Sequence, residues 1–223
     1  MKSQPLSETE IGQINYQNEL ARKGIHSASI LIPIIYYHIE RDLALLLLAI
    51  LFGGFFIVDL LKMFFSPLRN WYYAQFGGML RAHEQGTRSF NGATFVSLSA
   101  LILVFFFPKL IAIASFAILV VADTAAALVG RKFGKTKIFS KSLEGSIAFF
   151  VFALLVSFNT PKIHWGVALG MSFVGMIAEL IPIKLGDYTF DDNLTIPLST
   201  AVFAYVCYIF LMPESIMMIS ITP

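Results

Sequence analysis

The residues best suited to chemistry lie in one polar stretch, 130–146, with the sequence GRKFGKTKIFSKSLEGS. Gly130 and Gly134 would let backbone N–H groups approach phosphate oxygens closely. The single acid is Glu144, and the cations, which could neutralise a triphosphate, are Arg131, Lys132, Lys135, Lys137 and Lys141. A loop that only fixes membrane topology would explain the charge, but neither the glycines nor the lone acid. We therefore predict a phosphate-binding loop.

The segment GRKFGKT looks like a P-loop but fails its requirements. The motif needs four residues between its first glycine and the Gly-Lys pair, whereas three residues separate Gly130 from Gly134. A strand must also precede the motif, and here a long apolar segment of helical character precedes it. The loop is not a Walker A site.

Three acids interrupt long apolar segments of the chain: Asp59, Asp123 and Glu179. An ionisable residue inside a membrane span costs about 2.5–3.5 kcal/mol on insertion scales, so each needs a function or a partner. All three lie toward the end of their segment that adjoins basic loops, which predicts a shared polar cavity. For Asp59 an ion pair with Lys62 is an equal alternative, and for Glu179 a functional and a structural role stay open.

Asp123 is the strongest catalytic candidate of the three. It precedes Gly130 by seven residues, which is about 10 Å along a helix. Ala126, Ala127 and Gly130 follow it at helical spacing, and such small residues let a second backbone or a ligand come close. We predict a catalytic or metal-binding role, and the alternative is a structural bond to a neighbouring helix.

Two further clusters could contribute to a site. In DDNLTIPL, residues 191–198, Asp192 or Asn193 could cap a helix, or the carboxylates could hold Mg²⁺ together with a substrate phosphate. In ELARKGIH the spacing i, i+3, i+4, i+7 places four polar side chains on one helical face: Glu19, Arg22, Lys23 and His26. An anchor at the membrane surface would explain the cations of this face, but not its Glu and His.

The composition indicates which elements position these residues. Apolar residues make up 57% of the 223 positions and charged residues 13%, and the mean hydropathy is +0.75. A soluble domain carries about a quarter charged residues, so lipid must surround most of this chain. The net charge of +2 excludes a nucleic-acid-binding surface, and the single cysteine, Cys207, excludes a disulfide framework and a Cys-based zinc site.

We predict an all-α, polytopic bundle of about seven membrane spans. A cytosolic segment, 1–23, is polar enough to exclude a cleavable signal peptide. A transmembrane catalytic domain covers 24–212, and a tail covers 213–223. The predicted spans lie near 24–39, 43–61, 91–107, 110–130, 145–159, 164–183 and 194–212. Pro33 is expected to kink the first of them.

The distribution of Lys and Arg predicts the orientation. With a cytosolic N-terminus, all 16 basic residues fall on the inner side except Arg41, Lys109 and Lys162. The candidate site then faces the cytosol. The aromatic stretch 62–92 is too long for a tight turn and too polar to span, so we expect an interfacial helix there, with a substrate gate as the alternative.

These residues together resemble the family of dolichol kinases, phytol kinases and CTP-dependent diacylglycerol kinases. The resemblance rests on ELARKGIH, ADTAAALVGRKFGKTKI, KSLEGSIAFF and AELIPIKLGDYTFDDNLTIPL, in this order, and runs from about 19 to 212. It implies a short, core-only member of this polyprenol kinase family that transfers the γ-phosphate of CTP to the hydroxyl of a membrane lipid alcohol, with Mg²⁺ as cofactor. The lipid could be a polyprenol such as dolichol, phytol or diacylglycerol, and the oligomeric state stays open.

Under this resemblance the roles divide as follows. Asp123, Lys141 and Glu144 would be catalytic, and Asp123, Glu144 and Asp192 would hold Mg²⁺. The nucleotide would be bound by Gly130, Arg131, Gly134, Lys135, Ser142, Asn193 and Thr195. Glu19, Arg22, Lys23, His26 and Glu179 would contact the substrate or support the site.

Two other functions fit parts of the pattern. DTAAALVGRKFGK and KSLEG are also similar to phosphatidate cytidylyltransferase, but the C-terminal signature of that family is replaced here by DDNLTIPL. A transporter would have its polar site near the bilayer midplane and internal repeats, and neither is visible. A bacterial inner membrane is the expected location, with the endoplasmic reticulum as the alternative.

Overall fold

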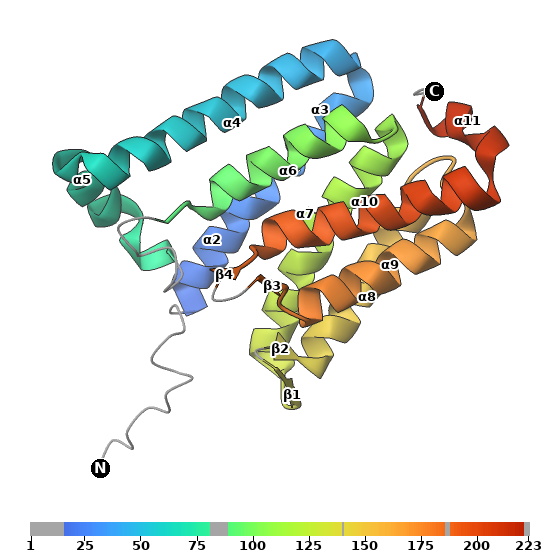
Figure 1. Ribbon diagram of the computed structural model, residues 1–223. Helices are drawn as coiled ribbons and strands as arrows, with labels where there is room; N and C mark the ends of the chain where they lie inside the picture. Colours follow the sequence, from blue (N-terminus) through green and yellow to red (C-terminus); the bar gives the residue numbers. More distant parts are fainter. Residues whose placement is uncertain (1–15, 81–88, 140, 186–187, 221–223) are drawn as a thin grey trace.

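The computed structural model describes residues 16–80, 89–139, 141–185 and 188–220 as a bundle of helices with two short hairpins (Figure 1). The helices, in chain order, are α2 Tyr16–Ala28, α3 Leu31–His38, α4 Arg41–Phe64, α5 Ser66–Phe76, α6 Gly92–Phe106, α7 Lys109–Phe133, α8 Leu143–Asn159, α9 Trp165–Leu180, α10 Asp192–Leu211 and α11 Ile216–Ser220. Short 3₁₀ turns, η1 Gly77–Met79 and η2 Pro213–Ser215, follow α5 and α10. The all-α prediction is confirmed.

Helix α7 is the centre of the bundle. It packs against α2, α3, α6, α8, α9, α10 and α11. Its sequence explains this position, because alanines and aliphatic residues occur on all faces of the helix. Twelve of its residues are buried. Asp123 is one of those twelve. The central helix thus carries the strongest catalytic candidate into the interior.

The apolar segments become helices close to their predicted bounds. Three of them, α4, α7 and α10, are long and apolar enough to cross a membrane. Three more, α6, α8 and α9, are apolar but shorter. Helix α4 buries few of its residues and exposes many aliphatic ones, as a helix in contact with lipid does.

The first predicted span, 24–39, is two helices rather than one kinked helix. Helix α2 ends at Ala28 and α3 begins at Leu31, so the break lies at Ser29 and Ile30. Proline cannot donate to the carbonyl four residues before it, and its ring crowds that carbonyl. For Pro33 that carbonyl belongs to Ser29. The interruption therefore lies at the carbonyl to which Pro33 cannot donate, and it is a full break between two helices rather than a kink within one.

The aromatic segment after α4 contains a separate short helix. Helix α5 has Pro67 in its first turn and none of its residues is buried. Turn η1 then contacts α2, with Gly78 close to Asn18. The segment therefore lies beside the helix that carries Lys23 and His26.

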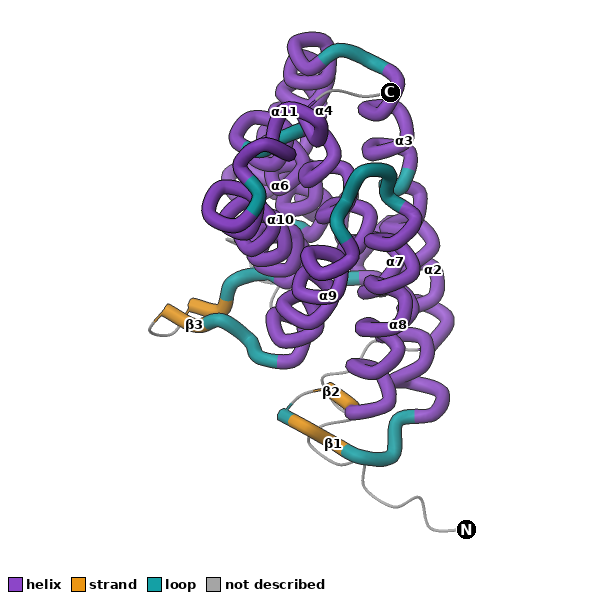
Figure 2. The backbone as a smooth tube through the Cα atoms, turned by 90° about the vertical axis from the view of Figure 1, so that its right-hand side faces the viewer, coloured by secondary structure: helices purple, strands orange, loops and turns teal. Residues whose placement is uncertain are grey.

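Two antiparallel hairpins, which the sequence reading did not predict, lie at one end of the bundle (Figure 2). Lys137–Ile138 (β1) pairs with Lys141–Ser142 (β2), and Lys184–Leu185 (β3) pairs with Tyr188–Thr189 (β4). In the first hairpin Phe139 has a positive φ of 53°, which permits a very tight turn. The first hairpin places Lys141 just before α8.

Candidate active site

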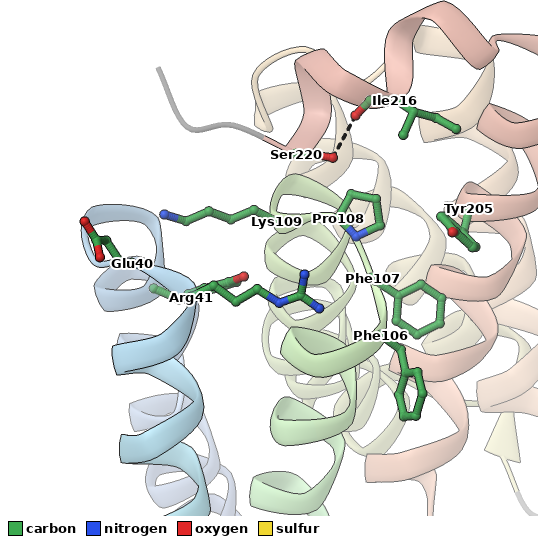
Figure 3. Close-up of a pocket in the computed structure, with 10 residues that line it drawn as sticks. Glu40, Arg41, Phe106, Phe107, Pro108, Lys109, Tyr205, Ile216 and Ser220 are labelled. Carbon is green, nitrogen blue, oxygen red and sulfur yellow. Dashed lines mark hydrogen bonds between the residues drawn. The ribbon is translucent and has the colours of Figure 1, made fainter.

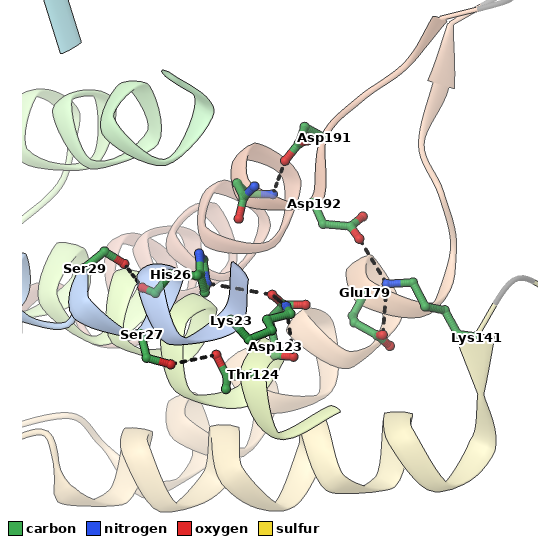
Figure 4. A network of polar contacts seen from close by, with 11 residues as sticks. Lys23, His26, Ser27, Ser29, Asp123, Thr124, Lys141, Glu179, Asp191 and Asp192 are labelled. Atoms are coloured by element: carbon green, nitrogen blue, oxygen red, sulfur yellow. Dashed lines mark hydrogen bonds and ion pairs between the residues drawn. The ribbon is translucent and has the colours of Figure 1, made fainter. Parts of the chain in front are cut away.

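Asp123 forms a buried ion pair with Lys23. The Lys23 ammonium contacts Asp123 Oδ2 directly, and the two side chains are only 3% and 7% exposed. Lys23 Nζ also donates to the Asp123 carbonyl oxygen at 3.4 Å. The pair joins α2 to α7, and it brings Lys23 of the polar face of α2 to Asp123 (Figure 4).

His26 approaches the same carboxylate one turn later on α2. Its Nε2 lies 3.8 Å from Asp123 Oδ2 and, among the described residues, has no hydrogen-bond partner. In the tautomer that carries its proton on Nδ1, Nε2 is an acceptor that faces a carboxylate oxygen. A hydroxyl beside this ring could donate its one hydrogen to Nε2, whereas Asp123 Oδ2 already accepts from Lys23.

The contact between α2 and α7 extends to a second pair of polar groups. Ser27 Oγ and Thr124 Oγ1 lie 3.4 Å apart, next to the Lys23–Asp123 pair in both helices. Ser29 Oγ donates to the His26 carbonyl oxygen at 2.6 Å, where α2 ends. These bonds fix the rotation of α2 about its axis, and with it the direction of Lys23 and His26.

Lys141 lies at the centre of a second charged cluster. Its Nζ is 3.0 Å from Glu179 Oε1 of α9 and 3.0 Å from Asp192 Oδ2 of α10. Ser146 Oγ of α8 donates to the other Glu179 oxygen, Oε2, at 3.2 Å. The hairpin before α8 is thereby tied to the ends of two other helices, and Figure 4 shows this cluster beside the Lys23–Asp123 pair.

The electrostatics of Lys141 favour the ammonium form. Burial alone would lower the pKa of this amine, but the carboxylates of Asp192, Glu179 and Asp123 outweigh burial and raise the pKa above its usual range. Lys141 therefore stays charged throughout the physiological range. Because the Asp123 charge also acts on it, the two clusters belong to one electrostatic site.

The glycines of the predicted phosphate loop have a packing role in the structure. A Cβ on Gly130 would lie 2.8 Å from Ser142 Oγ, and one on Gly134 would lie 2.1 Å from the Gly130 carbonyl oxygen. A Cβ on Gly145 would likewise lie 2.9 Å from the Ala126 carbonyl oxygen. Ser142 lies among them as the N-cap of α8, and its Oγ accepts from the Gly145 N–H at 3.2 Å. We call these residues, Gly130, Gly134, Ser142 and Gly145, the glycine junction.

The Glu144 carboxylate accepts hydrogen bonds from the loop backbone and is not part of the Asp123 cluster. The backbone N–H of Thr136 donates to Glu144 Oε1 at 3.2 Å and to Oε2 at 3.3 Å. Hydrogen bonds from its own backbone, and also from those of Lys135 and Thr136, hold the pKa of the Glu144 carboxyl below its ordinary value. Across the described ranges no three His, Cys, Asp or Glu side chains gather at metal-ligand spacing.

The start of α10 corrects one prediction. Neither Asp192 nor Asn193 is the N-cap of this helix. Asp191 is, since its Oδ1 accepts the Asn193 N–H at 2.8 Å. An Asp at the N-cap satisfies a backbone donor that the helix leaves unpaired, and this leaves the Asp192 carboxylate for Lys141.

The other predicted site residues lie around the two clusters. Asn193 and Thr195 are buried in the first turns of α10, and Arg22 is partly buried on α2. Arg131, in the last turn of α7, is partly buried, and Lys135 is exposed in the loop. Glu19 belongs to α2, but its side chain lies outside the described residues.

Asp59 belongs to a separate, buried cluster. It is 0% exposed and accepts from the Asn91 N–H at 2.8 Å, Asn91 Nδ2 at 2.9 Å and Thr94 Oγ1 at 2.6 Å. Lys62 Nζ lies 2.8 Å from Asp59 Oδ1 and 5.0 Å from the Tyr72 ring centroid. These bonds join the end of α4 to the start of α6, so the ion-pair alternative is the correct one for Asp59.

The reading of the sequence missed two features of the site. Ser146 was not singled out, because an isolated Ser in an apolar segment has no distinguishing pattern. The capping role of Ser142 had a signal, namely a Ser directly before an apolar run. No local sequence pattern could indicate that Glu179 bonds Ser146, because the two residues are on different helices.

Comparison of the sequence with known proteins identifies relatives of this chain. The uncharacterized protein RP860 of Rickettsia prowazekii is 31% identical over 202 residues, which cover 86% of this chain and 98% of that protein. CTP-dependent diacylglycerol kinase 1 of Schizosaccharomyces pombe is 26% identical over 220 residues, 87% of this chain and 95% of that protein. Phytol kinase 1 of Arabidopsis thaliana is 31% identical over 136 residues, 53% of this chain and 44% of that protein. No family model and no solved structure matches.

The charged clusters fit the kinase activity for which the relatives are named. Acids and lysines from α2, α7, α9, α10 and the first hairpin meet at one end of an apolar bundle. Besides the uncharacterized RP860, the relatives that match most of this chain include CTP-dependent diacylglycerol kinases of two yeasts. The chain therefore belongs to the family of membrane lipid kinases that includes the CTP-dependent diacylglycerol kinases and the phytol kinases, and it is a lipid-alcohol phosphotransferase.

Proposed function

We propose that this protein transfers the γ-phosphate of CTP to the hydroxyl of diacylglycerol. The observation that carries the proposal is the meeting of two lysine–carboxylate pairs, Lys23–Asp123 and Lys141–Asp192, beside the basic loop 130–142. Phosphoryl transfer depends mainly on positioning and on charge stabilisation, which such pairs can supply. CTP is the donor named for the relatives that this chain matches over most of its length.

Each lysine of the site is paired with a carboxylate, Lys23 with Asp123 and Lys141 with Asp192. These ion pairs balance the charge of the buried site, where an unpaired charge would be costly. A bound triphosphate would give Lys23 and Lys141 an anionic partner of higher charge. Asp123 and Asp192 would then be released toward a cation.

The donor set fits Mg²⁺ shared with a nucleotide rather than a cage built by protein alone. Mg²⁺ prefers oxygen ligands and is usually held by one or two carboxylates, substrate phosphates and waters. Asp123 and Asp192 can provide the carboxylates. For Glu144 to join them, its carboxylate must give up the Thr136 N–H. When bound, the cation would neutralise charge on the triphosphate.

The lipid hydroxyl has a suitable position between His26 and Asp123. There it would donate to His26 Nε2, the acceptor that has no partner among the described residues. The hydroxyl oxygen attacks the γ-phosphorus, the bond from that phosphorus to the bridging oxygen breaks, and the proton passes to Nε2. CDP leaves with the bridging oxygen.

Diacylglycerol is the proposed acceptor because of coverage. The chain spans 95% of the S. pombe diacylglycerol kinase and 74% of the Saccharomyces cerevisiae one, but 44% of the A. thaliana phytol kinase.

We further propose seven spans with the site facing the cytosol, which is the side that the distribution of Lys and Arg favours. The membrane would be a bacterial inner membrane, in keeping with the bacterial relative matched almost end to end.

The test uses purified full-length protein in detergent with γ-labelled CTP, Mg²⁺ and a panel of diacylglycerol, phytol and polyprenol. Label in phosphatidic acid is the expected result, and its loss with EDTA and return with added Mg²⁺ would establish the metal requirement. Label in phytyl or polyprenyl phosphate instead would contradict diacylglycerol as the acceptor. Release of pyrophosphate with phosphatidate, without label transfer, would indicate a cytidylyltransferase.

A further inference from the structure

Phe139 occupies the tip of the first hairpin in a backbone conformation that suits few residues with a side chain. Its φ is 53°, in the left-handed region where glycine and asparagine are favoured. A bulky aromatic residue is costly there, so the turn does not explain why the residue is phenylalanine. The ring is 72% exposed and contributes little to the packing of the bundle. Neither the fold nor the catalytic proposal uses this side chain, which indicates an external partner.

A second exposed ring and several cations accompany Phe139. Phe133 ends α7 and is 56% exposed, and Lys132 Nζ lies 5.3 Å from the centroid of its ring. Residues 131–139 include four cations and no acid. The surface is therefore apolar and positively charged at once. We call its exposed residues, Lys132, Phe133, Lys137 and Phe139, the aromatic tip.

The lysines of the aromatic tip are separate from the charged clusters of the active site. In the hairpin Lys137 is opposite Ser142, and Ile138 is opposite Lys141. Because opposite residues share a face and neighbouring residues alternate, Lys137 is on the other face of the hairpin from Lys141. Within the described ranges the ammonium groups of Lys132 and Lys137 make no hydrogen bond or ion pair. Their charge is thus available to a partner outside the protein.

The basic residues at the opposite end of the bundle are placed differently. Lys109 Nζ donates to the Ile39 carbonyl oxygen at 2.7 Å and extends toward Glu40 (Figure 3). Arg41 donates to the Phe105 carbonyl oxygen. Groups of the protein itself therefore bind the cations at that end, in contrast to those of the aromatic tip.

The length of α7 indicates that the aromatic tip is level with the lipid headgroups. Helix α7 has 25 residues and is one of the helices long enough to cross a membrane. At 1.5 Å per residue it is about 37 Å long, whereas the hydrocarbon core of a bilayer is about 30 Å thick. Its last turn, and the hairpin that follows at the same end of the bundle (Figure 2), then lie in the headgroup layer. Aromatic rings are stable in this layer, and lysines there attract anionic lipids.

We propose that the aromatic tip docks on the membrane surface at the active-site end of the bundle, with a preference for anionic lipids. Phe133 and Phe139 would enter the boundary between headgroups and acyl chains, and Lys132 and Lys137 would contact lipid phosphates. Docking would hold the hairpin, and with it Lys141, at a fixed depth in the membrane. The proposal does not depend on the identity of the nucleotide or of the acceptor lipid.

Fluorescence of full-length Phe139→Trp protein tests the proposal, in nanodiscs whose lipids carry brominated acyl chains. The wild type supplies the background from Trp71 and Trp165. The bromine should quench the added indole, and more strongly when phosphatidylglycerol replaces part of the phosphatidylcholine at constant bromine content. Lys137→Gln in this protein should lower the ratio of docked to undocked tip about fivefold, since a cation near an anionic surface contributes about that factor. Lys162→Gln, an exposed cation beyond the far end of α8, is the matched control and should leave the ratio unchanged.

Three results would overturn the proposal. The first is emission typical of water without quenching by bromine, and Phe133→Trp reports the same result if the Phe139→Trp protein does not fold. The second is equal quenching with and without phosphatidylglycerol. The third is quenching by CTP in detergent together with no effect of bromine in nanodiscs, which would assign the aromatic tip to the nucleotide instead.

Discussion

Ser146 Oγ donates to Glu179 Oε2 at 3.2 Å, while the opposite oxygen of the same carboxylate lies 3.0 Å from Lys141 Nζ. The first turn of α8 and the last turn of α9 are thus joined through one buried acid. Glu179 is 4% exposed and is far from the predicted loop in sequence, yet it determines where the ammonium of Lys141 lies. It is a positioning residue for the proposed phosphate contact.

Replacing Glu179→Gln should raise the KM for CTP about fivefold to tenfold with a smaller change in kcat. The amide can still accept from Ser146, but Lys141 loses one of its two charged anchors, and poorer positioning weakens its contact with phosphate. Steady-state kinetics with CTP as the varied substrate measure the change. Ser146→Ala should move KM in the same direction, whereas Ser157→Ala, a buried hydroxyl farther along α8, should not. A fall in KM for Glu179→Gln would show that the acid only neutralises Lys141.

Removing Lys23 alone should destabilise the protein more than removing both members of its ion pair. Lys23→Met leaves Asp123 buried without its ammonium partner, at a cost of about 3–5 kcal/mol. In the double variant with Asp123→Asn, no uncompensated charge remains, so thermal unfolding in detergent should recover part of the loss. Additive losses in this cycle would mean that the two side chains are not coupled.

Asp123→Asn alone should lower turnover by about 100-fold or more, while the protein still folds. The amide keeps the shape of the side chain but removes the charge proposed to act on the cation and on the lipid hydroxyl. Label transfer from CTP, normalised to folded protein on gel filtration, measures the effect. Near-wild-type turnover would remove Asp123 from the catalytic residues.

Gly145→Ala should destabilise the junction between α7 and α8 by about 1–3 kcal/mol. The added Cβ would meet the Ala126 carbonyl oxygen at 2.9 Å and Gly130 Cα at 3.2 Å, and backbone atoms cannot move aside as a side chain can. Gly53→Ala is the matched control, because its Cβ would meet nothing within 4 Å and alanine favours a helix. The melting temperatures in detergent should move in opposite directions, and a neutral Gly145→Ala would refute the close contact.

Breaking the Asp59 cluster should reduce stability without affecting the chemistry. Asp59→Ala leaves Lys62, which is fully buried, and the Asn91 amide without their acceptor. The melting temperature should fall, while turnover per folded molecule stays near that of the wild type. Loss of turnover in a folded Asp59→Ala protein would instead connect this cluster to the active site.

Much of the helical architecture could be predicted from local patterns. Apolar runs of sufficient length predicted the helices, and the acids within them marked the positions that needed partners. The partners themselves could not be predicted, because they depend on how helices rotate and pack. Lys23 was recognised as part of a polar face, but only the packing of α2 on α7 shows that this face meets Asp123.

The errors have local causes of the same kind. Asp192 or Asn193 was offered as the cap of α10 instead of Asp191, because all three residue types are good caps and only backbone geometry distinguishes a cap from a first-turn residue. The hairpins were missed because each strand has two residues, too few for an alternating pattern. The break before α3 follows from Pro33, but sequence alone did not show that the chain would break at the carbonyl rather than bend at the ring.

The glycine junction closes the ends of the loop that we propose as the nucleotide-binding segment. Gly134 and Ser142 lie at opposite ends of the basic segment and contact each other at one point, so the intervening residues form a loop whose ends are already closed. A loop closed in advance loses less conformational freedom when it wraps an anion, and this loss would otherwise reduce affinity. Under the proposed function, a bulkier side chain at the junction would free the loop ends and weaken nucleotide binding while every cation stayed in place.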